Sequence, residues 1–222
     1  MLQTQPLFVD LDGTLIRTDL LVESWLVLLR HRPFQALQAV WWLRRGKSYL
    51  KARIAELVVL SAEHLPYKHE LLAYLRAAHE QGRPLYLATA SHRRYADAVA
   101  AHLGLFRSVL ASDAQCNLSG SAKLAAIRAL VGDRFVYAGN DHVDVPIWNA
   151  ASAAIVVETS AAARAQIRTP VEAVFDRHGS RLYAWMRAMR PHQWLKNLLV
   201  FLPLLPIPVS YTHLTLPTIL LV

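Results

Sequence analysis

PLFVDLDGTL, at residues 6–15, is the stretch of sequence that decides the fold class. Its apolar run ends at Asp10, and Gly13 follows as a residue that permits a tight turn. A short apolar run that stops at turn-forming residues is typical of a buried parallel strand. The stretch therefore predicts a strand that opens into a loop carrying two carboxylates, Asp10 and Asp12.

The rest of the chain alternates between helical and extended patterns. Residues 19–80 carry apolar side chains at helical spacing throughout. After them come predicted strands at 85–89, 109–110, 135–138 and 154–157 and predicted helices at 95–103, 123–131 and 145–151. Strands that alternate with helices form a parallel sheet covered on both faces. We therefore expect an α/β, Rossmann-like domain at residues 1–178, with an all-helical cap at about 16–80 inserted after the first strand.

Composition narrows the class of protein. Hydrophobic residues make up 54% and charged residues 18% of the 222 residues, which excludes a disordered chain. The single cysteine, Cys116, excludes a disulfide framework and a cysteine-rich zinc site. The first residues, MLQTQP, lead directly into the predicted strand, so we expect no signal peptide.

The formal charge of +8 is concentrated in two places. Basic residues lie between Glu23 and Glu56, where no acidic residue occurs, and again at 177–196, ahead of the most apolar stretch. Basic residues beside apolar segments are typical of contact with a membrane surface. We therefore expect a membrane among the partners, and no nucleic acid.

Polar residues that can take part in catalysis or metal binding follow the predicted strands in a fixed order. The loops after parallel strands gather at one edge of the sheet, where such folds bind ligands. Two carboxylates two residues apart can serve as nucleophile and as acid and base, while hydroxyls and a lysine can hold phosphoryl oxygens. Oxygen ligands from two loops suit Mg²⁺. The residues concerned are Asp10, Asp12, Thr14, Thr89, Ser91, Lys123 and the turn Gly139-Asn140-Asp141-His142-Val143-Asp144.

These motifs resemble those of the haloacid dehalogenase (HAD) superfamily phosphatases, and the resemblance covers about residues 6–178. It implies that Asp10 attacks phosphorus to form an aspartyl-phosphate, and that Asp12 protonates the leaving group and then activates water. It also implies that Thr89 and Lys123 bind the phosphoryl group, and that the cap selects the substrate. The other implied substrate contacts are Gly13, Thr14, Ala90 and Ser91, and the implied Mg²⁺ ligands are Asp10, Asp12, Asn140, Asp141 and Asp144.

One position departs from the family pattern. Where the family has an acidic residue directly after the glycine of GDxxxD, this chain has Asn140. The loss of a charge should weaken Mg²⁺ binding, which leaves a non-catalytic or regulatory module as the alternative to a Mg²⁺-dependent phosphomonoester hydrolase. A receiver-like phosphate acceptor also uses Asp, Thr and Lys, but the long insert between Asp10 and Thr89 argues against it.

A second resemblance lies near the C-terminal end. Residues 190–203, RPHQWLKNLLVFLP, resemble the first membrane helix of UbiA-type prenyltransferases, in the branch of the decaprenyl-phosphate phosphoribosyltransferases. This implies that 179–208 begin a membrane domain, that the full-length protein lies in a bacterial inner membrane, and that the HAD domain is cytoplasmic. A small phosphorylated substrate, such as a lipid phosphate or sugar phosphate, would suit that arrangement.

The last residues, 209–222, look foreign to the protein. The decapeptide VSYTHLTLPT at 209–218 can be encoded by GTC TCT TAT ACA CAT CTG ACG CTG CCG ACG, which spells a transposon-end adapter used in sequencing libraries. We therefore expect a gene that was read into an adapter, so that prenyltransferase activity is not expected from this chain. Resequencing the locus tests this expectation.

Overall fold

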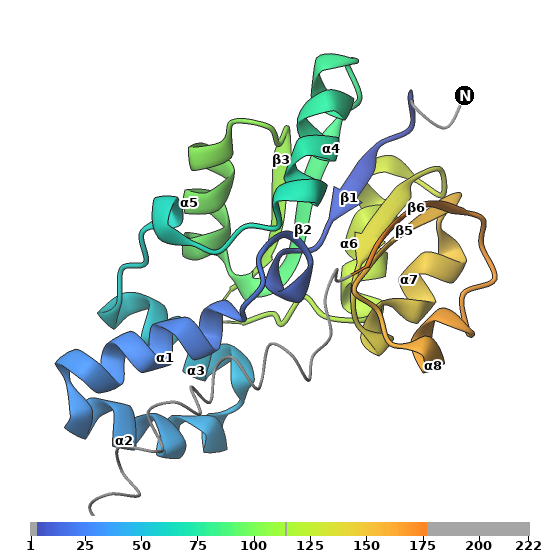
Figure 1. Cartoon of the computed structure of the whole chain (residues 1–222). Helices are drawn as coiled ribbons and strands as arrows, with labels where there is room; N and C mark the ends of the chain where they lie inside the picture. The colour runs from blue at the N-terminus through green and yellow to red at the C-terminus, as the bar shows by residue number, and fades with distance from the viewer. Residues whose placement is uncertain (1–3, 114, 177–222) are drawn as a thin grey trace, which may run out of the picture. The chain divides into compact units, whose positions relative to one another are not determined.

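The computed structural model describes residues 4–113 and 115–176, which all belong to the unit Met1–Arg177. Their core is a six-stranded sheet in the order β3-β2-β1-β4-β5-β6, in which every pair of neighbours is parallel (Figure 1). The predicted Rossmann-like α/β fold is therefore confirmed. The strands are β1 (Leu7–Val9), β2 (Leu85–His92), β3 (Ser108–Ser112), β4 (Val136–Gly139), β5 (Ala153–Val157) and β6 (Val171–Phe175).

Helices cover both faces of this sheet. Side chains alternate along β1, so that Leu7 and Val9 pack among residues of α4 and α5, whereas Phe8 packs among residues of α6 and α7. All three strand residues are fully buried, as expected for a sheet that is covered on both sides. The helices of these two layers are α4 (His69–Glu80), α5 (Arg93–Leu103), α6 (Ser121–Val131), α7 (Val145–Ala150) and the short α8 (Ala161–Arg164).

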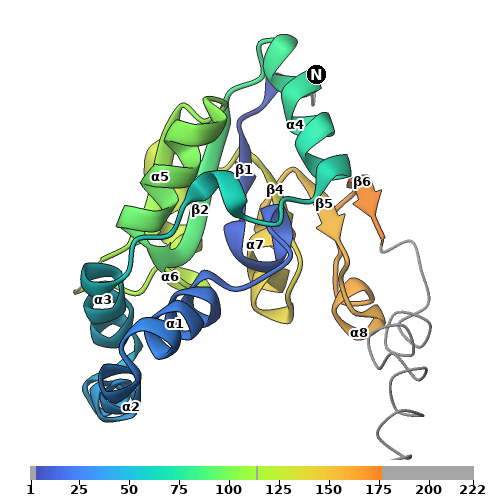
Figure 2. The same ribbon diagram turned by 60° about the vertical axis from the view of Figure 1, so that its left-hand side comes forward.

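Three helices form a separate cap with its own small core. They are α1 (Leu20–His31), α2 (Pro33–Trp42) and α3 (Lys47–Leu57), and they lie together to one side of the sheet (Figures 1 and 2). Within the predicted insert at 16–80, α4 instead packs on the sheet through its apolar face. The cap core consists of Leu28, Ala36, Ile54 and Val58.

The strand order reverses beside β1, and this reversal positions the site. The chain passes from β1 through β2 to β3 on one side, then returns to place β4, β5 and β6 on the other. Ligands bind at such a switch point, outside the carboxyl ends of the strands. Val9 pairs with Ala138, and the Asp10 N–H donates to the Ala138 carbonyl at 2.9 Å. Asp10 and the turn after β4 therefore meet at this edge.

β6 and α8 were not predicted from the sequence. β6 is an edge strand whose side chains are only partly buried, so its pattern lacks the continuous apolar run of the central strands. The predicted membrane segment at 179–208 and the foreign segment at 209–222 lie outside the described residues. No helix within the described part of the chain has the length and apolar character needed to cross a bilayer.

Candidate active site

The loop after β1 carries the first pair of carboxylates. Residues Leu11–Leu15 form a tight turn in which Asp12 and Gly13 leave helical backbone angles and Gly13 adopts a φ of +72°. A Cβ at Gly13 would collide with the side-chain amide of Asn140, so both the backbone angle and the close approach require glycine. The Lys68 ammonium donates to the Gly13 carbonyl at 2.5 Å, and the Thr14 hydroxyl donates to Asn140 Oδ1 at 3.1 Å. These contacts fix the loop between α4 and the turn after β4.

A chain of charged and polar groups links Asp10 to the turn after β4. Lys123 Nζ lies 2.8 Å from Asp10 Oδ1 and donates to the Tyr137 hydroxyl at 3.0 Å. That hydroxyl donates in turn to Asp144 Oδ1 at 2.8 Å. The other oxygen of Asp144 accepts the backbone N–H groups of Asn140 and Asp141 at 3.2 and 3.3 Å. Asp144 thereby shapes the turn, and Tyr137 joins it to the ammonium that holds Asp10.

Burial and charge shift the pKa values along this chain. Burial, with the nearby carboxylates of Asp144 and Asp12, raises the pKa of Asp10 to about 7, although Lys123 opposes the rise. Burial disfavours the charged form of Lys123, yet its pKa is raised because Asp10 and Asp144 lie close to it. Burial also raises the pKa of Tyr137 well above its ordinary value. Lys123 therefore remains a cation and Tyr137 a neutral hydroxyl near neutral pH.

Asp12 is held by hydroxyls and by the start of the cap. Its Oδ1 accepts the backbone N–H of Leu20 at 2.9 Å, and its Oδ2 accepts the Ser91 hydroxyl at 2.5 Å. The Thr89 hydroxyl lies at the limit of hydrogen bonding, 3.5 Å from Oδ2, and accepts the Ser91 N–H at 3.0 Å. Burial raises the pKa of Asp12, which favours the protonated carboxyl that can give a proton away.

A cavity of about 510 Å³ opens over these groups. It brings together most of the residues that the sequence singled out, whereas Thr14 and Thr89 are fully buried behind it and do not line it. Ser91 is thus the hydroxyl of this pair of β2 residues that faces the cavity. The predicted residues that line it are Asp10, Asp12, Gly13, Ala90, Ser91, Lys123, Asn140, Asp141 and Asp144.

The cap contributes basic side chains to the same cavity. Arg17 comes from the segment leading to the cap, and Lys47 and Lys51 come from α3. Lys51 Nζ donates to the Ala90 carbonyl at 2.6 Å and to Asn117 Oδ1 at 3.3 Å, and burial lowers its pKa. It therefore ties α3 to the end of β2 and to the loop after β3.

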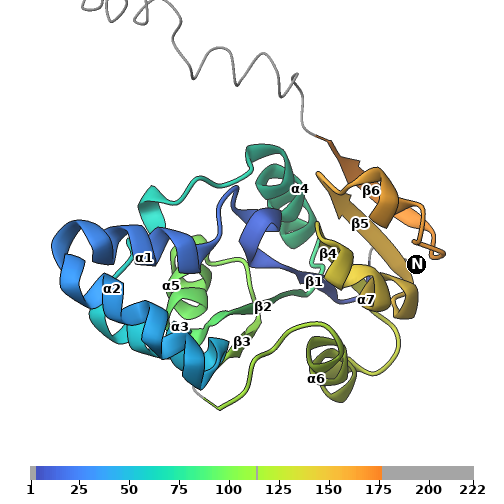
Figure 3. The same ribbon diagram turned by 90° about the horizontal axis from the view of Figure 1, so that it is seen from below.

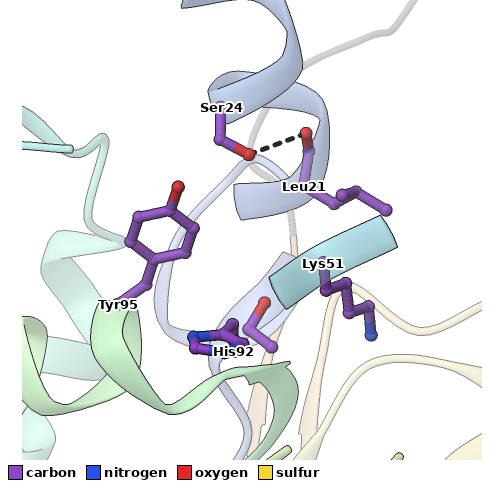
Figure 4. A pocket seen from close by; sticks show the side chains of 6 residues that line it. Leu21, Ser24, Lys51, His92 and Tyr95 are labelled. Atoms are coloured by element: carbon purple, nitrogen blue, oxygen red, sulfur yellow. Dashed lines mark hydrogen bonds between the residues drawn. The ribbon is translucent and has the colours of Figure 1, made fainter. Parts of the chain in front are cut away.

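A second, much smaller cavity marks the joint between cap and sheet. It measures about 10 Å³, close to the space of one water molecule, and Lys51, His92 and Tyr95 contribute to its wall (Figure 4). The Tyr95 hydroxyl donates to the Val58 carbonyl at 3.0 Å, which ties α5 to the end of α3. The joint is therefore closely packed. The hydrogen bonds of Lys51 and of Tyr95 hold α3 of the cap beside the active cavity.

The donor set fits a hard cation such as Mg²⁺ in its chemistry. Three carboxylates, on Asp10, Asp12 and Asp144, share the site with one buried ammonium, and their oxygens are the ligand type that Mg²⁺ prefers. Among the described residues, no three His, Cys, Asp or Glu side chains converge on one point. Asp12 and Asp144 direct both oxygens at protein donors. Asp10 engages Lys123 through Oδ1, and Asn140 Oδ1 accepts one hydrogen bond, from Thr14, so these two side chains that line the cavity are the donors best placed for a metal.

Asp141 has a structural role in the turn after β4. Its carboxylate accepts the His142 N–H at 2.6 Å, and with Asp144 it forms a reciprocal cap at the start of the next helical turn. It also lines the cavity. Its role as a metal ligand, like those of Asp12 and Asp144, stays a prediction.

Sequence reasoning missed three residues that organise the site. Tyr137 occupies a strand position that reads as ordinary core, and Lys68 and Lys51 occupy helix ends or faces that read as solvated. Two of the three are buried: Tyr137 is 0% and Lys68 7% exposed. A tyrosine two residues before the glycine of the last motif is the one signal that could have suggested a partner for Lys123.

Known proteins share this family pattern and fold. Residues 7–148 match the model of the haloacid dehalogenase-like hydrolase family. The uncharacterized protein y4nM of Sinorhizobium fredii is 34% identical over 202 residues, which cover 90% of this chain and 39% of that protein. The chain thus spans about two fifths of the length of this curated relative.

Solved structures with low sequence identity show the same fold. A protein of unknown function from Bordetella pertussis Tohama I has a TM-score of 0.57 and 18% identity, over 78% of this chain and 99% of that one. A probable phosphoserine phosphatase from Vibrio cholerae has a TM-score of 0.53 and 14% identity, over 76% of this chain and 61% of that one. At these identities the similarity concerns the fold.

Proposed function

The chain belongs to the haloacid dehalogenase-like hydrolase family, and we propose that it is a phosphatase that hydrolyses phosphomonoesters through an aspartyl-phosphate. The observation that carries the proposal is the Asp10 carboxylate, which lines the cavity while Lys123 holds one of its oxygens at 2.8 Å. Asp12 lines the same cavity two residues further on. A nucleophile and an acid therefore face one space, as transfer of a phosphoryl group to a carboxylate requires.

In the first step, a carboxylate oxygen of Asp10 attacks phosphorus and the bond from phosphorus to the ester oxygen breaks. Asp12 gives its proton to the departing oxygen, which leaves as an alcohol. Its hydrogen bonds to Ser91 and to the Leu20 N–H hold the carboxyl group in place during this transfer. Lys123 stabilises negative charge at the nucleophile and on the phosphoryl oxygens.

In the second step, water attacks the phosphorus of the aspartyl-phosphate. Asp12, now ionised, takes a proton from that water, the bond from Asp10 to phosphorus breaks, and inorganic phosphate leaves. Asp12 thereby regains the proton that it gave to the alcohol. Thr89 acts from behind the cavity, because its hydroxyl contacts the Ser91 N–H and Asp12 rather than open space.

Magnesium is the cofactor that this proposal includes. Asp10 and Asn140 would hold it, and a bound Mg²⁺ would offset charge on the transferring phosphoryl group. Asn140 is already oriented by the Thr14 hydroxyl, and it supplies an amide oxygen where a carboxylate would add a charge. The expected consequence is a requirement for more Mg²⁺ than a carboxylate at this position would need.

The cavity favours a substrate that carries negative charge beyond the reacting phosphate. Lys123 is engaged with Asp10, so Arg17, Lys47 and Lys51 are the cations that face the remaining space. Arg17 and Lys47 are exposed at its mouth, which leaves them able to move toward a ligand. A phosphorylated sugar or lipid with a second anionic group could bind these two side chains.

Phosphate release from p-nitrophenyl phosphate tests the proposal. The wild-type chain should release phosphate only when Mg²⁺ is present, and Asp10→Asn should abolish that release. Asp133→Asn is the matched control, because its side chain is 80% exposed just beyond the end of α6, where it pairs with Arg128, and it does not line the cavity. Absence of turnover in a folded, Mg²⁺-saturated chain, on this ester and on a panel of phosphorylated metabolites, would refute the proposal.

A regulatory module is the second candidate, and Asn140 favours it. An amide at this position removes one negative charge from the metal site, and its side chain is engaged with Thr14. In that case phosphorylated ligands or Mg²⁺ would bind without turnover. Calorimetric titration with inorganic phosphate separates the two: binding to a chain that releases no phosphate from any ester supports the module.

We further propose that this domain is attached to a UbiA-type membrane domain that begins at 179–208. The support is the resemblance of residues 190–203 and the basic residues that precede them, which favour a cytoplasmic hydrolase domain. In the full-length protein this would place the cavity at the inner membrane of a bacterium. An alkaline phosphatase reporter fused to the N-terminus should be inactive, and an active, periplasmic reporter would overturn the topology.

A further inference from the structure

Helix α2 buries two alanines and, apart from the partly buried Trp42, leaves its large apolar side chains exposed. Ala36 and Ala39 are 0% and 3% exposed, and Ala36 belongs to the cap core. The large side chains lie within one arc of the opposite face, at a spacing of three, four and seven residues. They are Phe34, Leu37, Val40 and Trp41, which are 81%, 64%, 65% and 65% exposed.

This apolar face lies on the outer side of the cap. In both Figure 1 and Figure 2, α2 is the cap helix that lies farthest from the sheet. Figure 3 shows the three cap helices together from below, beside the sheet. A large exposed apolar patch marks a surface that binds something.

Basic residues stand at both ends of α2. Arg30 and Arg32 precede it, and Arg44, Arg45 and Lys47 follow it, all of them exposed. The Arg44 guanidinium lies 4.3 Å from the centre of the Trp41 ring. Within the part of the chain that the structure describes, none of these five side chains forms an ion pair with a carboxylate.

We propose that the α2 face, defined as Phe34, Leu37, Val40 and Trp41 with their basic flanks, docks on the surface of an anionic lipid bilayer. A short helix with an apolar face, aromatic side chains and basic residues at its ends lies in the plane of a membrane interface. The apolar side chains enter the boundary between headgroups and acyl chains, and the arginines reach anionic headgroups.

Charge distinguishes the bilayer from a second copy of this chain. A two-fold contact would bring the same face of both copies together, so that Arg30, Arg32 and Arg44 would meet their own counterparts without any carboxylate between them. No acidic residue occurs between Glu23 and Glu56 that could relieve this repulsion. An anionic surface complements the same charges.

One basic residue that flanks the α2 face also belongs to the active cavity. Lys47 begins α3, two residues after Arg45, and lines the cavity that holds Asp10. The docking itself does not depend on catalysis and can be tested in an inactive chain.

A fluorescent reporter on α2 tests the docking in the full chain. Cys116 is the single cysteine and is exposed, so Cys116→Ser provides a background for Leu37→Cys labelled with an environment-sensitive dye. Leu130→Cys is the matched control, because Leu130 is 47% exposed on α6, away from the cap. Local dyes are needed because the segment 179–208 is itself expected to hold the chain on vesicles.

The expected result is a blue shift and quenching by nitroxide lipids at position 37, and neither at position 130. The change should occur on vesicles of phosphatidylcholine with phosphatidylglycerol and not on phosphatidylcholine alone. The double variant Arg44→Gln, Arg45→Gln should lower the ratio of docked to undocked cap by about 30-fold. Each arginine near an anionic surface contributes about 1 kcal/mol, and the two together correspond to this factor.

Three results would overturn the proposal. The first is an unchanged spectrum at position 37 with anionic vesicles. The second is an equal shift on neutral vesicles, which would show that the arginines do not contribute to membrane binding. The third is a shift without vesicles that grows with protein concentration, which would assign the face to a second copy of the chain.

Discussion

Replacing Asp10 by asparagine should abolish turnover and stabilise the folded chain at neutral pH. The pKa of Asp10 is raised from 3.8 to about 7, chiefly by burial. Between about pH 4 and 7 the native state therefore keeps a proton that the unfolded chain has released, so the free energy of unfolding falls as pH rises. Each tenfold change in the ionisation constant corresponds to about 1.4 kcal/mol, which sets the cost of ionised Asp10 at no more than about 4 kcal/mol.

Asparagine has nearly the same shape and carries no charge, so it escapes this cost. Water in the cavity relieves part of the cost of ionised Asp10. We therefore expect Asp10→Asn to raise the free energy of unfolding by about 2 to 4 kcal/mol at pH 8 and by almost nothing at pH 4. Urea unfolding at the two pH values, with EDTA to remove metal, measures the difference. Addition of Mg²⁺ at pH 8 should narrow it, since a cation beside Asp10 favours the ionised form.

Asp133→Asn is the control for this measurement. Its side chain is 80% exposed, and its replacement should change the free energy of unfolding by less than about 0.5 kcal/mol at either pH. If Asp10→Asn were no more stable than wild type at pH 8, or if its advantage did not grow with pH, burial would not be the force that acts on Asp10. The reasoning that assigns its charge state would then be wrong.

Three further changes test other parts of the structure. Tyr137→Phe removes the hydroxyl between Lys123 and Asp144. It should lower the free energy of unfolding by about 1.5–3 kcal/mol, measured by urea unfolding, and lower kcat about tenfold, measured by phosphate release. An unchanged kcat would show that the hydroxyl does not position the ammonium. Gly13→Ala forces a side chain into a left-handed backbone and should lose about 1–2 kcal/mol and most activity, whereas Gly82→Ala, where a Cβ meets nothing, should lose stability alone. Glu172→Gln breaks the ion pair that joins β6 to the segment before β2. Burial opposes ionisation of Glu172, but hydrogen bonds from an arginine and a tyrosine lower its pKa, so its contribution of about 1.5–3 kcal/mol should be present at pH 7 and vanish as pH falls below about 4 in acid-unfolding experiments.

The order of strands and helices could be predicted from the sequence because it depends on local patterns. Central strands such as β1 and β5 are continuous apolar runs, and the amphipathic helices between them repeat at helical spacing. The strand β6 escaped prediction because its sequence, VEAVF, is interrupted by Glu172 and its side chains are only partly buried, so it lacks the continuous apolar run of the central strands. The assignment of α4 to the sheet rather than to the cap also depends on contacts that are distant in sequence.

The candidate site divides in the same way. Asp10, Asp12, Lys123 and the turn after β4 could be found from motif order, because parallel strands deliver their ends to one edge of the sheet. Their roles within the site depend on the tertiary structure: it leaves Ser91 in the cavity and buries Thr89 behind it, although the two lie two residues apart on one strand.

The sequence alone determined the fold class and the set of residues that meet at the sheet edge, since both follow from hydrophobic periodicity and from the direction of parallel strands. Only the tertiary structure decided which groups hold Asp10 in place and which face of the cap is uncovered. Tyr137 reaches Lys123 from a position fourteen residues further along the chain, and α2 buries Ala36 in the cap core while Phe34 and Leu37 stay exposed. Hydrogen bonds and packing of this kind depend on the distances between elements, which no local pattern records.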